Sequence, residues 1–311
     1  MHEPQERSLP LDDGGTLALR AWEPAGEPVA SVVIGGAMGV PQAYYAAFAG
    51  WLAQQGYRVW TFDYRGHGAS RPPTPRHTLR GYQADLLDWV RDYEAVVRTA
   101  REERPALPLY LIGHSLGAQL PGLFEQPERV DGLLSIAAGS GYWRDNAPQL
   151  RRRVLFFWHV MVPLATGVCG YFPGKRLGMV GNLPAGVIRQ WRRWCLHPRY
   201  SAAEGPEALA RYARVRYPVL AWSFSDDEMM TLRGTHNLIK LYSNALRRVE
   251  SLQPAEAGVR RIGHFGLFRE SFRDTLWPRT LAGLRSLATR QVSSVPERTD
   301  NGVPQRDTAT S

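Results

Sequence analysis

The sequence predicts an α/β fold with a mostly parallel central sheet, flanking helices and an inserted helical cap. Three observations support this prediction. Short apolar runs of strand length alternate with helix-like segments along most of the chain. One such run leads directly into Gly-His-Ser-Leu-Gly at 113–117, a pattern typical of a sharp strand-to-helix turn. A basic, tryptophan-rich stretch at 141–216 then interrupts the alternation.

The predicted strands follow one another from the amino terminus. A turn signal, Asp-Asp-Gly-Gly at 12–15, precedes an apolar run at 17–22 and predicts an antiparallel strand pair. Further apolar runs are short enough for buried strands and lie at 31–36, 57–62, 109–112, 130–137 and 219–224. The clearest helix is predicted at 82–98, where Leu86, Val90, Tyr93 and Val97 recur at helical spacing.

Length and composition indicate one α/β core with an insertion. The chain has 311 residues and 44% hydrophobic content, enough to bury a large core. We expect residues 1–140 and 217–289 to form the core and residues 141–216 to form the cap. Residues 290–311 lack apolar periodicity and predict a disordered tail. The polar first ten residues predict neither a signal peptide nor an anchor, and hence a cytoplasmic protein.

The net charge of +9 resembles that of a nucleic-acid-binding protein, but its distribution argues against such a partner. Residues 141–217 contain thirteen Lys or Arg and three Asp or Glu, so the rest of the chain is close to neutral. The basic excess therefore belongs to an apolar cap. The two cysteines are too few for a disulfide framework and lack zinc-ligand spacing, so we expect neither a metal nor a cofactor.

The candidate nucleophile is Ser115. Flanking glycines let a serine occupy a strained turn that projects its Oγ above the sheet, and they place the Leu116 N–H at the start of the next helix. A serine hydroxyl needs a base, and the base needs a carboxylate that holds its tautomer. The motif therefore predicts that an acid and a histidine follow in the chain.

The candidate acid and base lie further along in the order Ser, Asp, His. Asp226 and Asp227 follow the predicted strand at 219–224; we expect Asp227 to be the acid, with Asp226 as the alternative. His264 is the predicted base; it lies between Gly263 and Gly266, before the last predicted helix. The alternative for the aspartates is that they only begin a turn or cap a helix.

A second backbone donor is expected after the strand at 31–36. Ala37 or Met38 would supply it, and together with Leu116 it would form an oxyanion hole. The glycines that precede Ala37 do not continue into the Gly-Lys-Ser/Thr of a phosphate loop.

These motifs resemble the α/β-hydrolase superfamily, in its serine aminopeptidase-like, lysophospholipase-like and monoacylglycerol-lipase-like branch. The resemblance covers about residues 10–288 and includes Asp-Tyr-Arg-Gly-His-Gly-Ala-Ser at 63–70 and Gly-His at 263–264. Gly35-Gly36 stands where relatives often have His-Gly. Segments of the cap, such as Gly-Tyr-Phe-Pro at 170–173, are similar to a bacterial subgroup of predicted hydrolases.

The resemblance implies a serine hydrolase that cleaves a carboxylic ester, in the manner of an esterase or lipase, through an acyl-enzyme on Ser115. Dehalogenase and epoxide hydrolase relatives need an aspartate at the position of Ser115, so the sequence argues against those activities. Two alternatives remain open. One is an acyltransferase with the same triad, and the other is a noncatalytic binding protein on a hydrolase scaffold.

The cap is the expected substrate-binding region. Residues 154–172 contain no charged side chain, which predicts an apolar cap helix; a lid that touches an anionic membrane surface and a spanning helix are the alternatives. The expected substrate is a small acyl compound, and a lipid-like compound is one candidate. Candidate substrate-binding residues are Trp143, Arg144, Arg189 and Trp191, and the alternative for the arginines is a solvated face or pairing within the cap.

Overall fold

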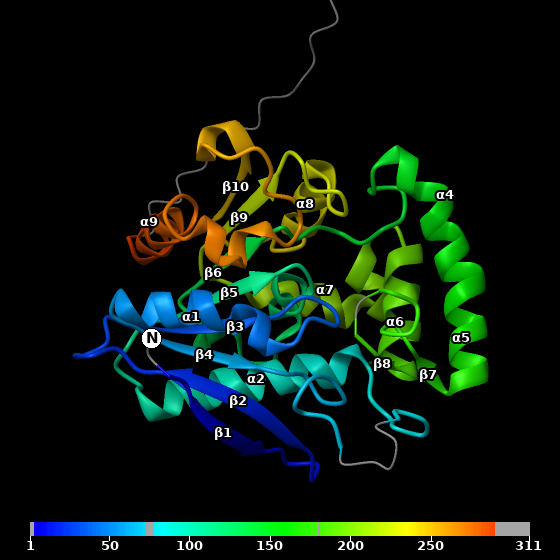
Figure 1. Ribbon diagram of the computed structural model, residues 1–311, viewed down its shortest axis with the longest axis horizontal. Coiled ribbons are helices and arrows are strands. Elements are labelled where there is room, and N and C mark those ends of the chain that lie inside the picture. The colour runs from blue at the N-terminus through cyan, green and yellow to red at the C-terminus, as the bar shows by residue number, and fades with distance from the viewer. Residues whose placement is uncertain (1–2, 73–77, 180, 290–311) are drawn as a thin grey trace, which may run out of the picture.

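An eight-stranded sheet forms the centre of the computed structural model, which describes residues 3–72, 78–179 and 181–289 (Figure 1). The strand order is β1-β2-β4-β3-β5-β6-β9-β10. The β1–β2 and β2–β4 pairs are antiparallel, and every other neighbouring pair is parallel. The strands are β1 (Gln5–Pro10), β2 (Thr16–Trp22), β3 (Ala30–Gly35), β4 (Tyr57–Phe62), β5 (Leu109–His114), β6 (Gly132–Ile136), β9 (Val219–Phe224) and β10 (Arg247–Leu252). The predicted α/β fold class is confirmed.

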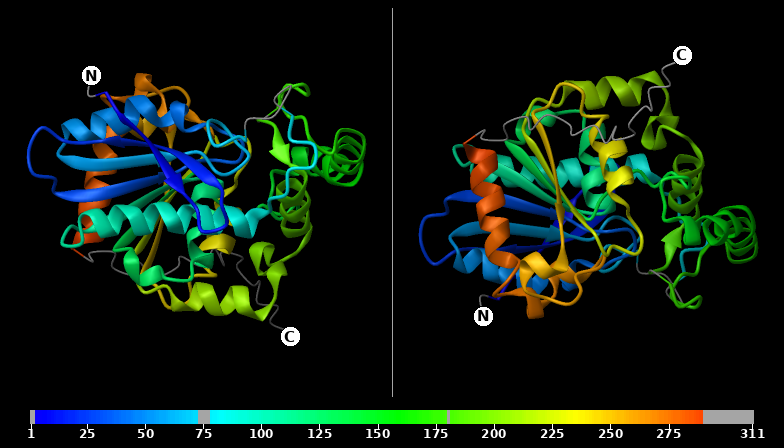
Figure 2. Two further views of the ribbon diagram at one scale, coloured as in Figure 1. Left: turned by 90° about the horizontal axis from the view of Figure 1, so that it is seen from below. Right: turned by 90° about the horizontal axis from the view of Figure 1, so that it is seen from above.

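The two faces of the sheet are buried under different helices, because successive side chains of a strand point to opposite faces. On β3, Val33 belongs to the core cluster that includes α2 (Leu86–Glu103). Its neighbours Val32 and Ile34 belong to the cluster that includes α1 (Ala46–Gln54) and α9 (Trp277–Ala288). Figure 2 shows the sheet between these two layers of helices.

Short helices lie in the connections outside the long helices. These are η1 (Gln42–Tyr45), α3 (Leu116–Gln119), η3 (Pro121–Leu123), η4 (Pro127–Arg129), α8 (Leu232–Ile239), η7 (Pro254–Ala257), η8 (Gly266–Phe268) and η9 (Glu270–Phe272). Of these, η1 follows β3, and α3 follows β5 directly. Both therefore begin at the carboxyl ends of parallel strands, where active sites of open α/β sheets gather.

The chain between β6 and β9 is mainly helical. It contains α4 (Pro148–Phe156), the π-helix η5 (Phe157–Met161), α5 (Val162–Cys169), β7 (Tyr171–Phe172), β8 (Leu183–Pro184), α6 (Ala185–Leu196), η6 (Tyr200–Glu204) and α7 (Pro206–Arg214). Figures 1 and 2 show α4 and α5 standing away from the sheet. The side chain of Gln190 on α6 accepts a hydrogen bond from the Leu86 N–H, which links this group to α2. No helix in the described part of the chain combines the length and apolar content needed to cross a bilayer.

Helix α2 begins four residues later than predicted and ends later as well. Asp85 has extended backbone angles, its side chain accepts a bond from the Asp88 N–H, and the Asp88 side chain accepts one from the Asp85 N–H. This capping box begins the helix at Leu86, so the predicted start at residue 82 was wrong. The predicted tail at 290–311 lies outside the described residues, and the division into core and cap stays a prediction.

Candidate active site

Ser115 lies on a strained turn between β5 and α3. Its backbone has φ 52° and ψ −112°, outside the regions that non-glycine residues ordinarily occupy. The Ser115 N–H donates to the Ile136 carbonyl at the end of β6, at 2.9 Å. A Cβ on Gly117 would lie 2.0 Å from the Gly35 carbonyl oxygen, so only glycine permits this close approach of α3 to β3. Ser115 thus lies on a strained strand-to-helix turn and is 7% exposed, and its role as nucleophile stays a prediction.

Asp227 and His264 are hydrogen-bonded to each other. His264 Nδ1 lies 2.9 Å from Asp227 Oδ2, and the two side chains are 1% and 0% exposed. The other oxygen, Asp227 Oδ1, accepts bonds from the backbone N–H groups of Met229 and Met230. Because an ionised carboxylate only accepts hydrogen bonds, the hydrogen in the bond between Asp227 and His264 is carried by His264 Nδ1. The lone pair on Nε2 is then the basic one.

Asp226 contacts the backbone of the histidine loop instead of the ring. Its carboxylate accepts bonds from the Ile262 N–H at 2.8 Å and the Gly263 N–H at 3.1 Å. The structure therefore brings Asp227, and not Asp226, to the imidazole of His264.

Glu228 was missed by the sequence analysis. Its carboxylate accepts a bond from the His264 N–H at 3.2 Å. Burial opposes its ionisation, but hydrogen bonds from its own backbone, from the His264 N–H and from Arg261 bring the net pKa of Glu228 below its usual value. Asp226 and Glu228 thus hold three consecutive N–H groups of the histidine loop, and Asp227 between them holds the ring. The acidic run Asp-Asp-Glu at 226–228 was the sequence feature from which a role for Glu228 could have been predicted.

The two candidates for the second oxyanion donor differ in their bonding. The Ala37 N–H donates to Tyr45 Oη at 2.8 Å and is occupied. Among residues 3–72, 78–179 and 181–289, nothing accepts a hydrogen bond from the N–H of Met38 or of Leu116. Both Ala37 and Met38 are buried, in the loop that leaves β3.

An apolar pocket of about 590 Å³ lies in the inserted helical group. Its walls are made mainly by α4, η5 and α6. Met229 and Met230, which follow Asp227, complete the lining and bring it to the loop that carries the acid. Aliphatic, aromatic and thioether side chains dominate the lining. Such a lining suits a hydrocarbon chain.

Of the four predicted substrate-binding residues, only Trp191 lines this pocket. Arg189 is exposed and lines a different, open pocket on α6. The Arg144 guanidinium lies over the Trp143 ring, 4.9 Å from its centre, and neither residue lines the apolar pocket.

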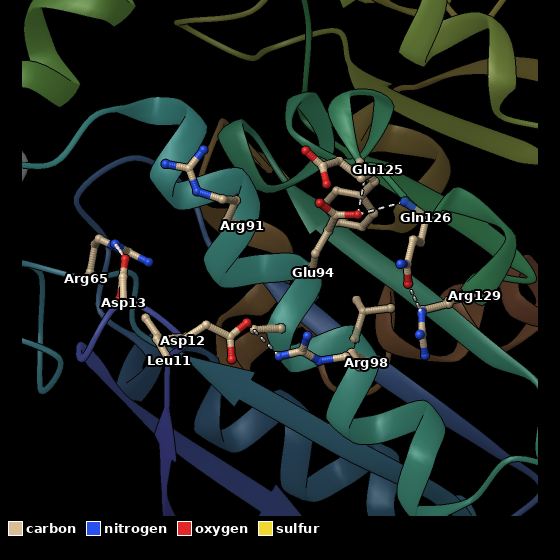
Figure 3. A pocket seen from close by; sticks show the side chains of 13 residues that line it. Leu11, Asp12, Asp13, Arg65, Arg91, Glu94, Arg98, Glu125, Gln126 and Arg129 are labelled. Atoms are coloured by element: carbon tan, nitrogen blue, oxygen red, sulfur yellow. Dashed lines mark hydrogen bonds and ion pairs between the residues drawn. The ribbon is translucent and has the colours of Figure 1, made fainter.

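A third pocket, of about 250 Å³, is lined mainly by charged side chains and is separate from these residues (Figure 3). It lies between the β1–β2 turn and α2, and its arginines are paired with neighbouring groups. Arg65 binds Asp13, and Arg98 lies 3.8 Å from Asp12. Within the described residues, no three His, Cys, Asp or Glu side chains are grouped to hold a metal ion.

Comparison with known proteins identifies the family. The serine aminopeptidase S33 family model matches residues 26–253. The chain is 30% identical over 127 residues to monoglyceride lipase of Rattus norvegicus, which is 40% of each chain. It is 28% identical over 136 residues to monoacylglycerol lipase of Mycolicibacterium smegmatis, 44% of this chain and 46% of the relative. These matches span less than half the length of each relative.

The fold is also that of solved hydrolases. A soluble variant of monoglyceride lipase from Saccharomyces cerevisiae superimposes with a TM-score of 0.67 at 16% identity, over 92% of this chain and 96% of the other. A carboxyl esterase from Bacillus coagulans gives a TM-score of 0.63 at 12% identity, over 92% and 99%. The narrower likeness to a bacterial subgroup stays a prediction. Because the family model covers most of the chain, this protein belongs to the serine aminopeptidase S33 family of α/β-hydrolase-fold serine hydrolases.

Proposed function

We propose that this protein hydrolyses carboxylic esters through an acyl-enzyme on Ser115, with His264 as general base and Asp227 as the acid that holds it. The observation that carries the proposal is the buried 2.9 Å bond between Asp227 and His264 in a chain whose elbow serine has a strained backbone. An acid, a base and a strained serine in this chain order are the parts that acyl transfer needs.

The proposed reaction has two steps. His264 Nε2 takes the Ser115 hydroxyl proton while Oγ attacks the ester carbonyl, and the proton then passes to the departing alcohol. A water molecule attacks the acyl-enzyme with the same base and releases the carboxylic acid. The N–H groups of Leu116 and Met38 would bind the oxyanion, because the Ala37 N–H is bonded to Tyr45.

The proposed substrate is an ester with a hydrocarbon acyl chain. The apolar pocket of about 590 Å³ supports this choice, because its volume and lining suit an alkyl chain. Relatives named monoglyceride and monoacylglycerol lipases support the same chemical class. In this proposal residues 141–216 act as the cap that encloses the chain, and Trp191 contributes one wall.

We further propose that the cap contacts lipid surfaces. Four apolar side chains at four-residue intervals along α4, η5 and α5 are 45–65% exposed: Phe156, Val160, Leu164 and Val168. Arg152 and Arg153 on α4 are exposed beside this stripe and would favour an anionic surface. The cytoplasmic location predicted from the polar first residues remains a prediction.

Turnover of p-nitrophenyl esters of increasing chain length tests the function. We expect kcat/KM to rise from acetate to octanoate, and Ser115→Ala to abolish turnover. Met161→Trp, which adds bulk to the pocket lining, should reduce octanoate turnover more than acetate turnover. Val160→Trp is the matched control because Val160 is exposed and does not line the pocket. Absence of ester turnover by the folded wild-type protein would contradict the proposal.

A further inference from the structure

His114, the residue before Ser115, is bonded at both ring nitrogens. The side chain is 0% exposed. Its Nδ1 lies 2.8 Å from Tyr45 Oη, and its Nε2 lies 3.0 Å from the His264 carbonyl oxygen. The elbow histidine therefore bridges a tyrosine on η1 and the backbone of the loop that carries the proposed base.

The chemistry of the partners allows one direction for the protons. The His264 carbonyl can only accept, so His114 Nε2 carries the hydrogen. In a neutral ring Nδ1 is then the acceptor, so the Tyr45 hydroxyl donates to it. Tyr45 Oη in turn accepts the Ala37 N–H at 2.8 Å. One continuous chain of hydrogen bonds runs from Ala37 through Tyr45 and His114 to His264.

Burial keeps both side chains neutral. Burial, and then the nearby His264, hold the pKa of His114 well below its usual value. Burial likewise raises the pKa of Tyr45. The His114 ring centre lies 5.2 Å from that of His264 and 5.9 Å from that of Tyr45, so the three rings pack as one cluster.

We propose that Tyr45 and His114 are positioning residues that hold the oxyanion loop after β3 and the base loop after β10 in fixed register across the elbow. In this chain of hydrogen bonds, called the relay, the Ala37 N–H is bonded to Tyr45. The Met38 N–H is then the one left to bind the substrate oxyanion. The relay also fixes the His264 carbonyl, while Glu228 fixes the His264 N–H. Tyr44, beside Tyr45, donates to the carbonyl of Phe265 and supports the same loop.

The proton positions can be tested on the wild-type protein. Long-range ¹H–¹⁵N correlation spectra of protein labelled at histidine nitrogens distinguish the two neutral tautomers. We expect His114 to carry its proton on Nε2 and to show a hydrogen-bonded acceptor at Nδ1, with His114→Gln used for assignment. In Tyr45→Phe the Nδ1 resonance should move toward that of an unbonded acceptor. A proton on Nδ1, or an unchanged Nδ1 resonance in Tyr45→Phe, would overturn the relay.

The positioning role predicts coupled kinetic effects with p-nitrophenyl butyrate. Tyr45→Phe should lower kcat about tenfold or more and change KM less than threefold, because the loops lose register while the acyl pocket is untouched. In His114→Gln, the amide keeps a donor near the His264 carbonyl but no acceptor near Tyr45. Adding Tyr45→Phe to the His114→Gln variant should therefore lower kcat by less than a further threefold. Full multiplication of the two single effects would overturn the proposal.

The matched control is Tyr212→Phe, which removes another fully buried, hydrogen-bonded hydroxyl, in this case from the Gln119 carbonyl. It should lower the melting temperature about as much as Tyr45→Phe and leave kcat within threefold. An equal loss of kcat in both variants would reduce the role of Tyr45 to stability and overturn the proposal. The kinetic part rests on the proposed function. If the wild type cleaves no ester, that function fails, whereas the tautomer measurement still tests the relay.

Discussion

Asp227 Oδ2 lies 2.9 Å from His264 Nδ1, and this contact joins the carboxyl end of β9 to the loop after β10 inside the protein. The neighbouring acids bond to the backbone of the same loop, Asp226 to Ile262 and Gly263 and Glu228 to His264, and Glu228 also pairs with the Arg261 side chain. One short acidic segment therefore both orients the imidazole and fixes the loop that carries it. The two tasks are separable by mutation.

Asp227→Asn should lower kcat for p-nitrophenyl butyrate by about 10⁴-fold, because an amide cannot hold the imidazole with its basic lone pair on Nε2. Asp226→Asn is the control. Its amide oxygen can still accept from the backbone, so kcat should fall less than tenfold. Steady-state kinetics of both variants check this prediction. Equal losses would mean that Asp227 has no special role.

Gly117→Ala should destabilise the protein by at least about 2 kcal/mol, because the new Cβ would lie 2.0 Å from the Gly35 carbonyl oxygen. Gly167→Ala is the matched change: Gly167 lies in α5, and a Cβ there would meet nothing within 4 Å. That variant should gain up to about 1 kcal/mol from helix propensity. Urea unfolding measures both, and a Gly117→Ala variant as stable as the wild type would contradict the close packing of α3 on β3.

Asp92 should make stability fall as pH rises. Burial raises the pKa of this carboxyl to about 6, against the hydrogen bonds and charge of Arg65, which lower it. The pKa of Asp92 is higher in the folded state than in the unfolded state. Its stabilising contribution to the unfolding free energy is therefore fully present below about pH 4 and is lost as pH rises through about 6. The unfolding free energy of the wild type minus that of Asp92→Asn should therefore decrease between pH 4 and pH 7. A constant or increasing difference would show that Asp92 ionises normally.

The exposed stripe on the cap predicts binding to anionic vesicles. Leu164→Asp combined with Val168→Asp should reduce cosedimentation with phosphatidylglycerol vesicles at least tenfold, because carboxylates replace side chains that are 64% and 65% exposed. Turnover of soluble p-nitrophenyl butyrate should stay within twofold. Val29→Asp, at a residue that is 59% exposed before β3, is the control and should bind as the wild type does. Wild-type protein that fails to sediment with vesicles would refute the proposed lipid contact.

The central strands were predictable because they are buried on both faces. β4 and β9 match the predicted ranges, since short runs of mainly apolar residues favour buried strands. β10 was not assigned a range, because its charged residues at 247, 248 and 250 break the apolar pattern at the sheet edge. The start of α2 depended on whether Asp85 or an earlier residue capped it, which the apolar spacing does not encode.

The site was predictable only as far as local motifs extend. Ser115 was identified from the glycines around it, and the two other proposed triad members from their order in the chain. The choice between Asp226 and Asp227 depended on which carboxylate faces the imidazole. The sequence does not show in which direction each of two adjacent side chains points. The bonds of His114 to Tyr45 and His264 span 69 and 150 residues, and no local pattern marks them.

Intact-mass labelling with a fluorophosphonate tests whether Ser115 is an activated nucleophile, because the reagent reacts with activated serines whatever the preferred substrate. We expect one adduct on the wild-type protein, none on Ser115→Ala and much slower labelling of His264→Ala. An adduct that persists in Ser115→Ala, or folded wild-type protein that gains none, would contradict an activated nucleophile at Ser115.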